Sequence, residues 1–133
     1  MNEVSILTPY ARSLGIELHD WNDGEPVLSV GFSDAVAGRP GAMHGGAISG
    51  LLETAGYGLL RARLTADGRN ATLAPINITV QFLRAGNEQT SYAAARITKL
   101  GRRTANLAVE AWQDDRSKPI ATAVMNVMIR ERD

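Results

Sequence analysis

A glycine-rich loop that leads into a long apolar helix constrains this chain more than any other stretch. It runs from Gly38 to Glu53 with the sequence GRPGAMHGGAISGLLE. Apolar residues recur beyond the loop at helical spacing, and at about 100° per residue they fall within one stripe that suits a single buried face. The pattern predicts a helix that extends to about Arg63. Its buried stripe contains Ile48, Leu51, Leu52, Ala55, Leu59 and Ala62.

The start of this helix is unusual because no Ser, Thr, Asp or Asn occupies the N-cap position. The tripeptide His44-Gly45-Gly46 stands there instead. We therefore expect the N–H groups of the first turn to lack a side-chain partner. Vacant donors at the positive end of a helix dipole favour an oxyanion, and glycine lets a ligand approach the backbone closely.

The face opposite the stripe is small and semi-apolar, whereas a solvated face is normally rich in Lys, Glu and Gln. Glu53 is the only ionised group on it. We expect a second backbone or a ligand to pack against this face, which contains Gly46, Ser49, Gly50, Glu53, Tyr57 and Leu60.

The distance from Gly45 to Glu53 carries a further consequence. Eight residues of helix separate them by about 12 Å along the axis. A glutamate side chain spans ~4 Å and leans toward the helix N-terminus, so Glu53 cannot touch a group bound at its own helix start. If both residues act on one substrate, they come from two chains. Two antiparallel helices related by a two-fold axis would pair them twice.

The remainder of the chain has the alternation and turn residues of antiparallel strands. We predict a short helix or turn over residues 3–14, then two strands, 16–19 and 27–32, joined by the Asp-Gly turn at 22–25. After the helix, four strands follow in a meander, with Pro75 near the beginning of the first or at an edge. They span residues 76–83, 90–98, 104–112 and 120–130. We expect one α+β domain over residues 1–133, with an antiparallel sheet wrapped around the central helix.

Composition excludes several classes of function. The chain has 14 basic residues (Lys and Arg) and 14 acidic residues (Asp and Glu). Its net charge therefore gives no reason to expect binding to nucleic acid or to an anionic membrane. The absence of cysteine excludes disulfides and thiolate chemistry, and two histidines, His19 and His44, are too few for a typical zinc site. The sequence has no signal-peptide pattern and no 18-residue apolar segment, so we expect a cytoplasmic protein. We also expect no metal or redox cofactor.

The helix start resembles a motif of the hotdog-fold acyl-CoA thioesterases of the phenylacetate-degradation (PaaI-like) family. The shared features are His44-Gly45-Gly46 and a carboxylate, Glu53, nine residues past the histidine. Residues 77–84 (NITVQFLR) resemble the family's strand after the helix, and residues 99–104 (KLGRRT) resemble its later hairpin. The resemblance covers roughly residues 15–130. It implies a homodimer with sheets joined edge to edge, usually paired again into a tetramer.

The resemblance also implies roles for particular residues. The N–H of Gly45 would polarise the thioester carbonyl, and Glu53 of the neighbouring subunit would act as nucleophile or as base for water. The acyl group remains open among aromatic, hydroxylated aromatic and medium-chain groups. Two positions depart from the family pattern. Gly38 stands where relatives commonly have Asn, and Pro75, with Thr72 nearby, stands where they often have Ser or Thr.

Other residues near the motif are candidates for binding the substrate. Gly46 flanks the carbonyl site, and Ser49 and Tyr57 either line the acyl pocket or pack at a helix interface. For His44 we favour a local hydrogen bond that fixes the turn over a direct catalytic role. Four basic residues are candidates for binding the phosphates of coenzyme A: Arg84, Lys99, Arg102 and Arg103. Charged residues are also common at hairpin tips without any binding role.

Two alternatives to hydrolysis follow from the same residues. The first is an acyl-CoA-binding module without turnover, which Gly38 and Pro75 favour. The second is a hotdog enoyl-CoA hydratase or dehydratase, in which His44 and Glu53 would converge on one acyl chain across subunits.

Overall fold

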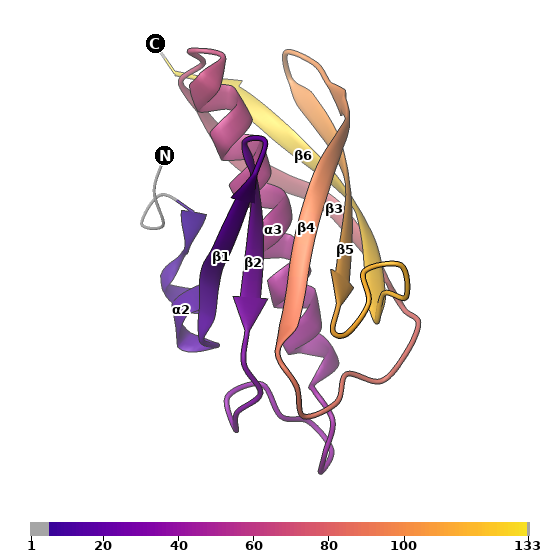
Figure 1. Ribbon diagram of the computed structural model, residues 1–133. Helices are drawn as coiled ribbons and strands as arrows, with labels where there is room; N and C mark the ends of the chain where they lie inside the picture. The colour runs from indigo at the N-terminus through magenta and orange to yellow at the C-terminus, as the bar shows by residue number, and fades with distance from the viewer. Residues whose placement is uncertain (1–5, 133) are drawn as a thin grey trace.

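The computed structural model describes residues 6–132, in which a six-stranded antiparallel sheet curves around one long helix, α3 (Figure 1). This arrangement confirms the predicted hotdog architecture. Residues 3–5 of the first predicted segment lie outside the described part. The helices are α2 (Pro9–Ser13) and α3 (Gly45–Ala66), and the strands are β1 (Ile16–Asn22), β2 (Glu25–Val30), β3 (Ala71–Phe82), β4 (Ser91–Leu100), β5 (Thr104–Trp112) and β6 (Ala121–Glu131).

The strands lie in the order β1-β2-β4-β5-β6-β3, which corrects the predicted four-strand meander. The hairpins β4–β5 and β5–β6 form as expected, because their connections are short. Strand β3, however, pairs with β6 and not with β4. The loop of residues 83–90 passes beneath the end of the sheet to reach β4 (Figure 1). Strand β4 pairs with β5 on one side and with β2 on the other. Strands β1 and β3 are therefore the two edges of the sheet.

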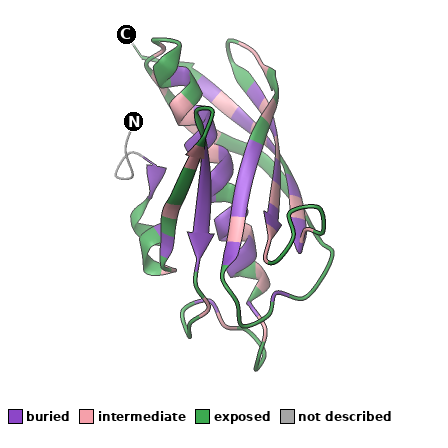
Figure 2. Cartoon of the chain, in the orientation of Figure 1, coloured by how far each residue is buried: buried purple, intermediate pink, exposed green. Residues whose placement is uncertain are grey.

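Helix α3 packs its apolar stripe against the concave face of the sheet. All members of the predicted stripe are buried except Ala62, which is half-buried. Gly56 allows close approach at this contact, because a Cβ there would collide with the sulfur of Met125 on β6. In Figure 2 the buried colour fills most of β2 and much of the first half of β4, which lie over this helix. The helix continues to Ala66, three residues beyond the predicted end.

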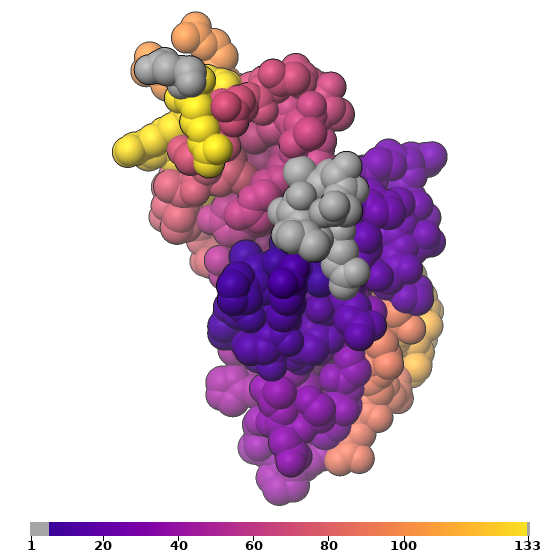
Figure 3. Space-filling view, turned by 90° about the vertical axis from the view of Figure 1, so that its left-hand side faces the viewer, coloured from indigo at the N-terminus to yellow at the C-terminus, as the bar shows by residue number. Residues whose placement is uncertain are grey.

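The N-terminal segment covers another side of α3. Thr8 caps α2 by accepting the Ala11 N–H at 3.1 Å, and Pro9 occupies the first helical position, where proline is tolerated. A Cβ on Gly50 of α3 would lie 3.2 Å from both Tyr10 and Leu14 of this segment. Figure 3 shows the segment, in indigo, lying across the middle of this face. Part of the small-residue face of α3 is thus covered by the chain itself.

Strand β3 begins at Ala71, five residues earlier than predicted, and contains a bulge between Pro75 and Asn77. Pro75 lies on an edge strand, as expected from its missing N–H. Most of the strand is exposed, although the sequence predicts a half-buried one. The difference arises because α3 packs mainly on β2, β4 and β5 and covers little of β3.

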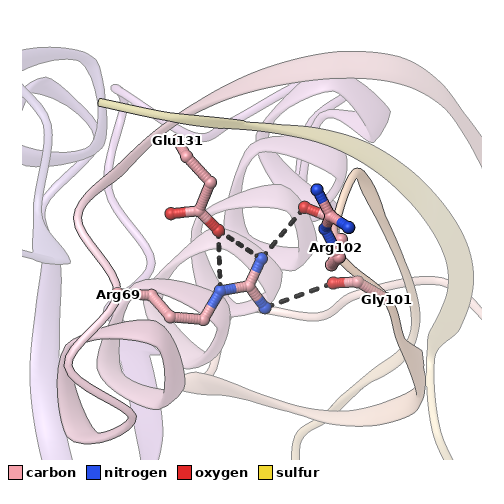
Figure 4. Close-up of polar contacts among 4 residues, drawn as sticks. All are labelled: Arg69, Gly101, Arg102 and Glu131. Atoms are coloured by element: carbon pink, nitrogen blue, oxygen red, sulfur yellow. Dashed lines mark hydrogen bonds and ion pairs between the residues drawn. The ribbon is translucent and has the colours of Figure 1, made fainter. Parts of the chain in front are cut away.

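Arg69 ties together three segments at the end of the sheet that is remote from the helix start (Figure 4). Its Nε and Nη2 atoms donate to Glu131 Oε1 at 2.9 and 2.6 Å. Its Nη1 and Nη2 atoms also donate to the carbonyls of Gly101 and Arg102 at 3.2 and 3.0 Å. The β4–β5 hairpin is therefore fixed to the end of β6 through its backbone, which leaves the Arg102 guanidinium outside this network.

No helix within residues 6–132 combines the length and the apolar character needed to cross a membrane.

Candidate active site

His44 is the N-cap of α3, with an extended backbone at φ −68° and ψ 135°. Its Nδ1 atom accepts the N–H of Gly46 at 2.8 Å, so the local hydrogen bond predicted for His44 is present. The expectation that no side chain would serve the first turn was wrong at Gly46, because an imidazole nitrogen replaces the usual cap oxygen. The His44 carbonyl accepts the next two N–H groups, those of Ala47 and Ile48, at 3.0 and 3.1 Å.

The N–H of Gly45 differs from its neighbours, since it meets no hydrogen-bond acceptor within residues 6–132. Gly45 is half-buried and lies beside the ring of Phe82 at the end of β3. A Cβ added to Gly45 would be 3.4 Å from that ring. A vacant donor at the positive end of a long helix, beside an apolar ring, is suited to an oxygen that develops negative charge. Phe82 was not among the predicted site residues, and its place beside Gly45 depends on a contact distant in sequence.

The loop before the helix folds back onto the helix start. The His44 N–H donates to the Val36 carbonyl of this loop at 2.7 Å. The Met43 N–H donates at 2.9 Å to the carbonyl of Gly86, which lies in the loop after β3. A Cβ on Gly38 would lie 3.0 Å from the Cα of His44, so a side chain there requires the loop to shift. The glycine at this position therefore permits the close contact between the loop and the helix start.

Glu53 is exposed and makes no hydrogen bond or ion pair with the described residues. It lies eight residues past Gly45 on an uninterrupted helix, which corresponds to a separation of about 12 Å along the axis. The structure therefore does not bring the vacant donor and the carboxylate together within one chain.

Glu53 belongs to a strip of α3 that neither the sheet nor the N-terminal segment covers. Gly46 and Glu53 are exposed on it, and Ser49 and Tyr57 are half-buried. Two residues expected on the same face, Gly50 and Leu60, are instead buried.

Tyr57 and Arg61 follow Glu53 along the same strip. The guanidinium carbon of Arg61 lies 5.4 Å from the centre of the Tyr57 ring. Burial raises the pKa of Tyr57, the charge of Glu53 raises it further, and Arg61 opposes both. Burial lowers the pKa of Arg61, while Tyr57 opposes that change. Sequence reasoning missed Arg61, although its spacing of four residues from Tyr57 and eight from Glu53 marks the same helical face.

A small pocket lies between this strip and the N-terminal segment. Its volume is about 80 Å³, which is room for a few atoms. Glu53 lies at its edge, so the pocket adjoins the candidate carboxylate. The lining residues are Ile6, Thr8, Tyr10, Gly50, Glu53, Thr54, Tyr57 and Arg61.

The predicted phosphate-binding cations lie at opposite ends of the molecule. Arg84 is exposed on the loop after β3, at the end where α3 begins, and its N–H donates to the Ile120 carbonyl at 3.1 Å. Lys99, Arg102 and Arg103 are exposed at the β4–β5 hairpin, at the other end (Figure 1). A single chain does not bring Arg84 together with the hairpin cations.

The edge strand β3 exposes large apolar side chains beside α3. Ile78 and Phe82 are 37% and 55% exposed, yet their cross-strand partners Met125 and Ala121 are buried beneath the helix. Paired residues of antiparallel strands point to the same face, so Ile78 and Phe82 extend the apolar inner face beyond the edge of the helix. An uncovered apolar edge of this kind is typical of an association surface.

The sheet wrapped around α3 and the vacant donor at its start define an α+β protein of the hotdog class. Sequence comparison agrees with the fold, since the family described as acyl-CoA thioesterase N-terminal domain matches residues 35–128. The chain belongs to this family, which confirms the thioesterase resemblance first indicated by His44-Gly45-Gly46 and Glu53.

Solved structures give the same fold. A thioesterase from Haemophilus influenzae superposes with a TM-score of 0.84 at 18% identity, over 97% of this chain and 87% of that chain. A conserved protein from Pseudomonas aeruginosa gives 0.79 at 20% identity, over 95% and 97% of the two chains. A phenylacetic acid degradation-related protein from Ralstonia eutropha gives 0.77 at 27% identity, over 92% and 91%. The comparison with curated proteins returned no match.

Proposed function

We propose that this protein is an acyl-CoA thioesterase that hydrolyses an aromatic or medium-chain acyl-CoA to the free acid and coenzyme A. The observation that carries the proposal is the vacant N–H of Gly45 at the start of α3, in a chain that belongs to a thioesterase family. The proposed chemistry calls for no metal or redox cofactor.

In this mechanism the thioester carbonyl oxygen accepts the Gly45 N–H. Negative charge develops on that oxygen when the carbonyl carbon is attacked, and the donor and the helix dipole stabilise it. Glu53 either removes a proton from the attacking water or attacks directly, which forms an anhydride that water then cleaves. The carbon–sulfur bond breaks in both routes, and the coenzyme A thiolate leaves and takes up a proton.

The mechanism requires two copies of the chain, because Glu53 cannot reach the start of its own helix. The exposed apolar edge of β3 supports a dimer in which two such edges meet antiparallel and two α3 helices face one another. Gly45 of one copy would then lie beside Glu53 of the other. Two such dimers pair into a tetramer in this proposal.

The same dimer gives the remaining candidates a role. Antiparallel pairing turns one copy end over end, so the hairpin with Arg102 and Arg103 approaches the end where the other copy carries Arg84. These cations would bind the phosphates of coenzyme A from both chains. His44, Gly46 and Ser49 would surround the carbonyl, and Tyr57 would contact the acyl group.

One observation favours a second function, acyl-CoA binding without turnover. Gly38 occupies the position at which relatives commonly carry Asn, and its contact with the His44 backbone leaves no room for such a side chain without a shift. A hydratase has less support, because the Nδ1 atom of His44 accepts the Gly46 N–H. The neutral imidazole then carries its proton on Nε2, so neither ring nitrogen is free to act as a base.

The test is release of coenzyme A, measured with a thiol reagent, from aromatic and medium-chain acyl-CoAs. We expect turnover by the wild-type protein and a loss of roughly 10²–10⁴-fold in kcat for Glu53→Gln. Glu17→Gln removes an exposed carboxylate from β1 and serves as the matched control, with unchanged kcat. Binding without thiol release across the panel would favour the non-catalytic alternative, and full activity of Glu53→Gln would refute the catalytic assignment.

A further inference from the structure

The strip of α3 beyond Glu53 carries a cation that the proposed hydrolysis does not use. Arg61 is half-buried, and its guanidinium lies over the Tyr57 ring. The ion pairs of residues 6–132 involve other arginines: Arg63 with Asp67, Arg69 with Glu131 and Arg116 with Glu110. Arg61 therefore has no carboxylate partner in the described part of the chain.

A half-buried guanidinium without an anionic partner is costly, because it has lost part of its hydration and gained no opposite charge. The lowered pKa of Arg61 reflects that loss of water. Stacking on Tyr57 recovers part of the cost but leaves the N–H donors at the edge of the guanidinium available. Those donors match a carboxylate in both charge and geometry.

The position of Arg61 relates this cation to the proposed reaction. Tyr57 is one helical turn past Glu53, about 6 Å along the axis, and the Arg61 side chain leans back over the Tyr57 ring. The pocket of about 80 Å³ that Glu53, Tyr57 and Arg61 share has room for the tip of a ligand but not for a whole acyl-CoA. A group attached to a thioester at Glu53 would place its far end here.

We infer that Tyr57 and Arg61 form the far end of the acyl site and select acyl-CoA substrates whose acyl group ends in a carboxylate. The inference rests on the proposed function for the place of the thioester, at Glu53. The acyl chain lies along the strip, over Tyr57, and its terminal carboxylate accepts hydrogen bonds from the Arg61 guanidinium. An acyl group of the same length with an uncharged end leaves that cation unpaired.

The test compares charged and neutral acyl groups of equal length: adipyl-CoA with hexanoyl-CoA, and 4-carboxyphenylacetyl-CoA with 4-methylphenylacetyl-CoA. The first pair reports on an aliphatic chain and the second on an aromatic one. We expect the wild-type protein to prefer the charged member of at least one pair by tenfold or more in kcat/KM, roughly the strength of a charge-assisted hydrogen bond. A neutral acyl group that is hydrolysed as well as its charged counterpart in both pairs would overturn the inference.

Variants test whether Arg61 is the source of the preference for a charged acyl group. Arg61→Gln should lower kcat/KM for the preferred charged substrate by about 10- to 100-fold and change the neutral one less than threefold. Arg61→Lys keeps the charge and should keep part of the preference. Arg63→Gln removes an exposed cation from the same stretch of helix and should change neither substrate. An equal loss on both substrates in Arg61→Gln would show that Arg61 only supports the fold.

A binding measurement separates this inference from the proposed hydrolysis. Thioether analogues have a methylene between the coenzyme A sulfur and the carbonyl carbon, so they cannot be hydrolysed. Calorimetry measures their affinity directly. If no acyl-CoA releases coenzyme A, hydrolysis is refuted, yet tenfold tighter binding of the adipyl analogue over the hexanoyl analogue still supports the carboxylate site. That preference should vanish in Arg61→Gln. Equal binding of the two analogues by the wild-type protein would refute the site.

Discussion

The Nδ1 atom of His44 accepts the Gly46 N–H at 2.8 Å, and this bond separates the two glycines of the helix start into different roles. Gly46 is satisfied by the cap, whereas the N–H of Gly45 stays vacant among the described residues. The histidine thus fixes the turn that contains Gly45, which lies beside the Phe82 ring at the uncovered edge of the sheet. In the proposed mechanism, the Gly45 N–H binds the thioester carbonyl oxygen and stabilises its developing negative charge.

Replacement of the cap should lower stability without removing the donor. His44→Ala loses the hydrogen bond to Gly46, and we expect the free energy of unfolding to fall by about 1 kcal/mol. His44→Asn can supply a cap oxygen and should recover most of that loss. Urea unfolding at neutral pH measures both variants. Equal stability of the wild-type protein and His44→Ala would contradict the role given to the cap.

The Gly45 donor can be removed with little change to the helix. Gly45 is the first helical residue, where proline is favoured, and the extended backbone of His44 suits a residue before proline. Gly45→Pro lacks the N–H, so we expect kcat to fall by roughly 10²–10³-fold. Gly45→Ala keeps the N–H, and its Cβ meets Phe82 at an ordinary contact distance of 3.4 Å, so it should keep most of the activity. Similar activity of the two variants would argue against a donor at Gly45.

A charge on the apolar edge of β3 should dissociate the dimer. Ile78 is 37% exposed on the inner face of β3, where a lysine is tolerated by an isolated chain but would be buried without a partner in the proposed interface. We expect Ile78→Lys to sediment as a folded monomer and to lose activity. Glu17→Lys places the same charge on β1, the other edge strand, and should remain associated and active. A stable, active Ile78→Lys dimer would exclude this edge as the interface.

Tyr57 should make stability depend on pH in the alkaline range. Burial raises the pKa of Tyr57 above its ordinary value of 10.0, so the folded protein keeps a proton that the unfolded chain loses. The contribution is fully present below pH 10 and is lost as the pH rises through the folded pKa. Relative to Tyr57→Phe, the wild-type protein should therefore lose stability above pH 10, measured by urea unfolding at several pH values. Parallel pH profiles would contradict a raised pKa for the half-buried Tyr57.

The sequence predicts most local elements of the fold because their signals are local. The positive φ angles of Asp23 and Gly24, 50° and 81°, form the expected hairpin turn, and the apolar stripe of α3 is buried as its spacing requires. The place of β3 beside β6 could not be read in the same way. Alternation gives the two faces of a strand but not its neighbour, so a nearby strand and a distant one fit equally well.

The candidate site shows the same division. The motif from His44 to Glu53 can be recognised from spacing, and the helical rise already implies that Gly45 and Glu53 need two chains. A local hydrogen bond of His44 was expected, but its role as the cap of Gly46 was missed, because histidine is not among the usual N-cap residues. Phe82 was missed as a neighbour of Gly45 because the contact joins the start of α3 to the end of β3, and no local pattern encodes it.

Mixing two inactive variants tests whether the Gly45 donor of one chain and the Glu53 carboxylate of another form one site. Glu53→Gln keeps the Gly45 donor, and Gly45→Pro keeps the Glu53 carboxylate. When the two proteins are dissociated and reassociated together, half of the dimers are mixed and each mixed dimer has one complete site. We predict recovery of about a quarter of the wild-type rate of coenzyme A release. If the mixture stays as inactive as its components although mixed dimers form, the donor and the carboxylate do not act across two chains, and the proposed mechanism is contradicted.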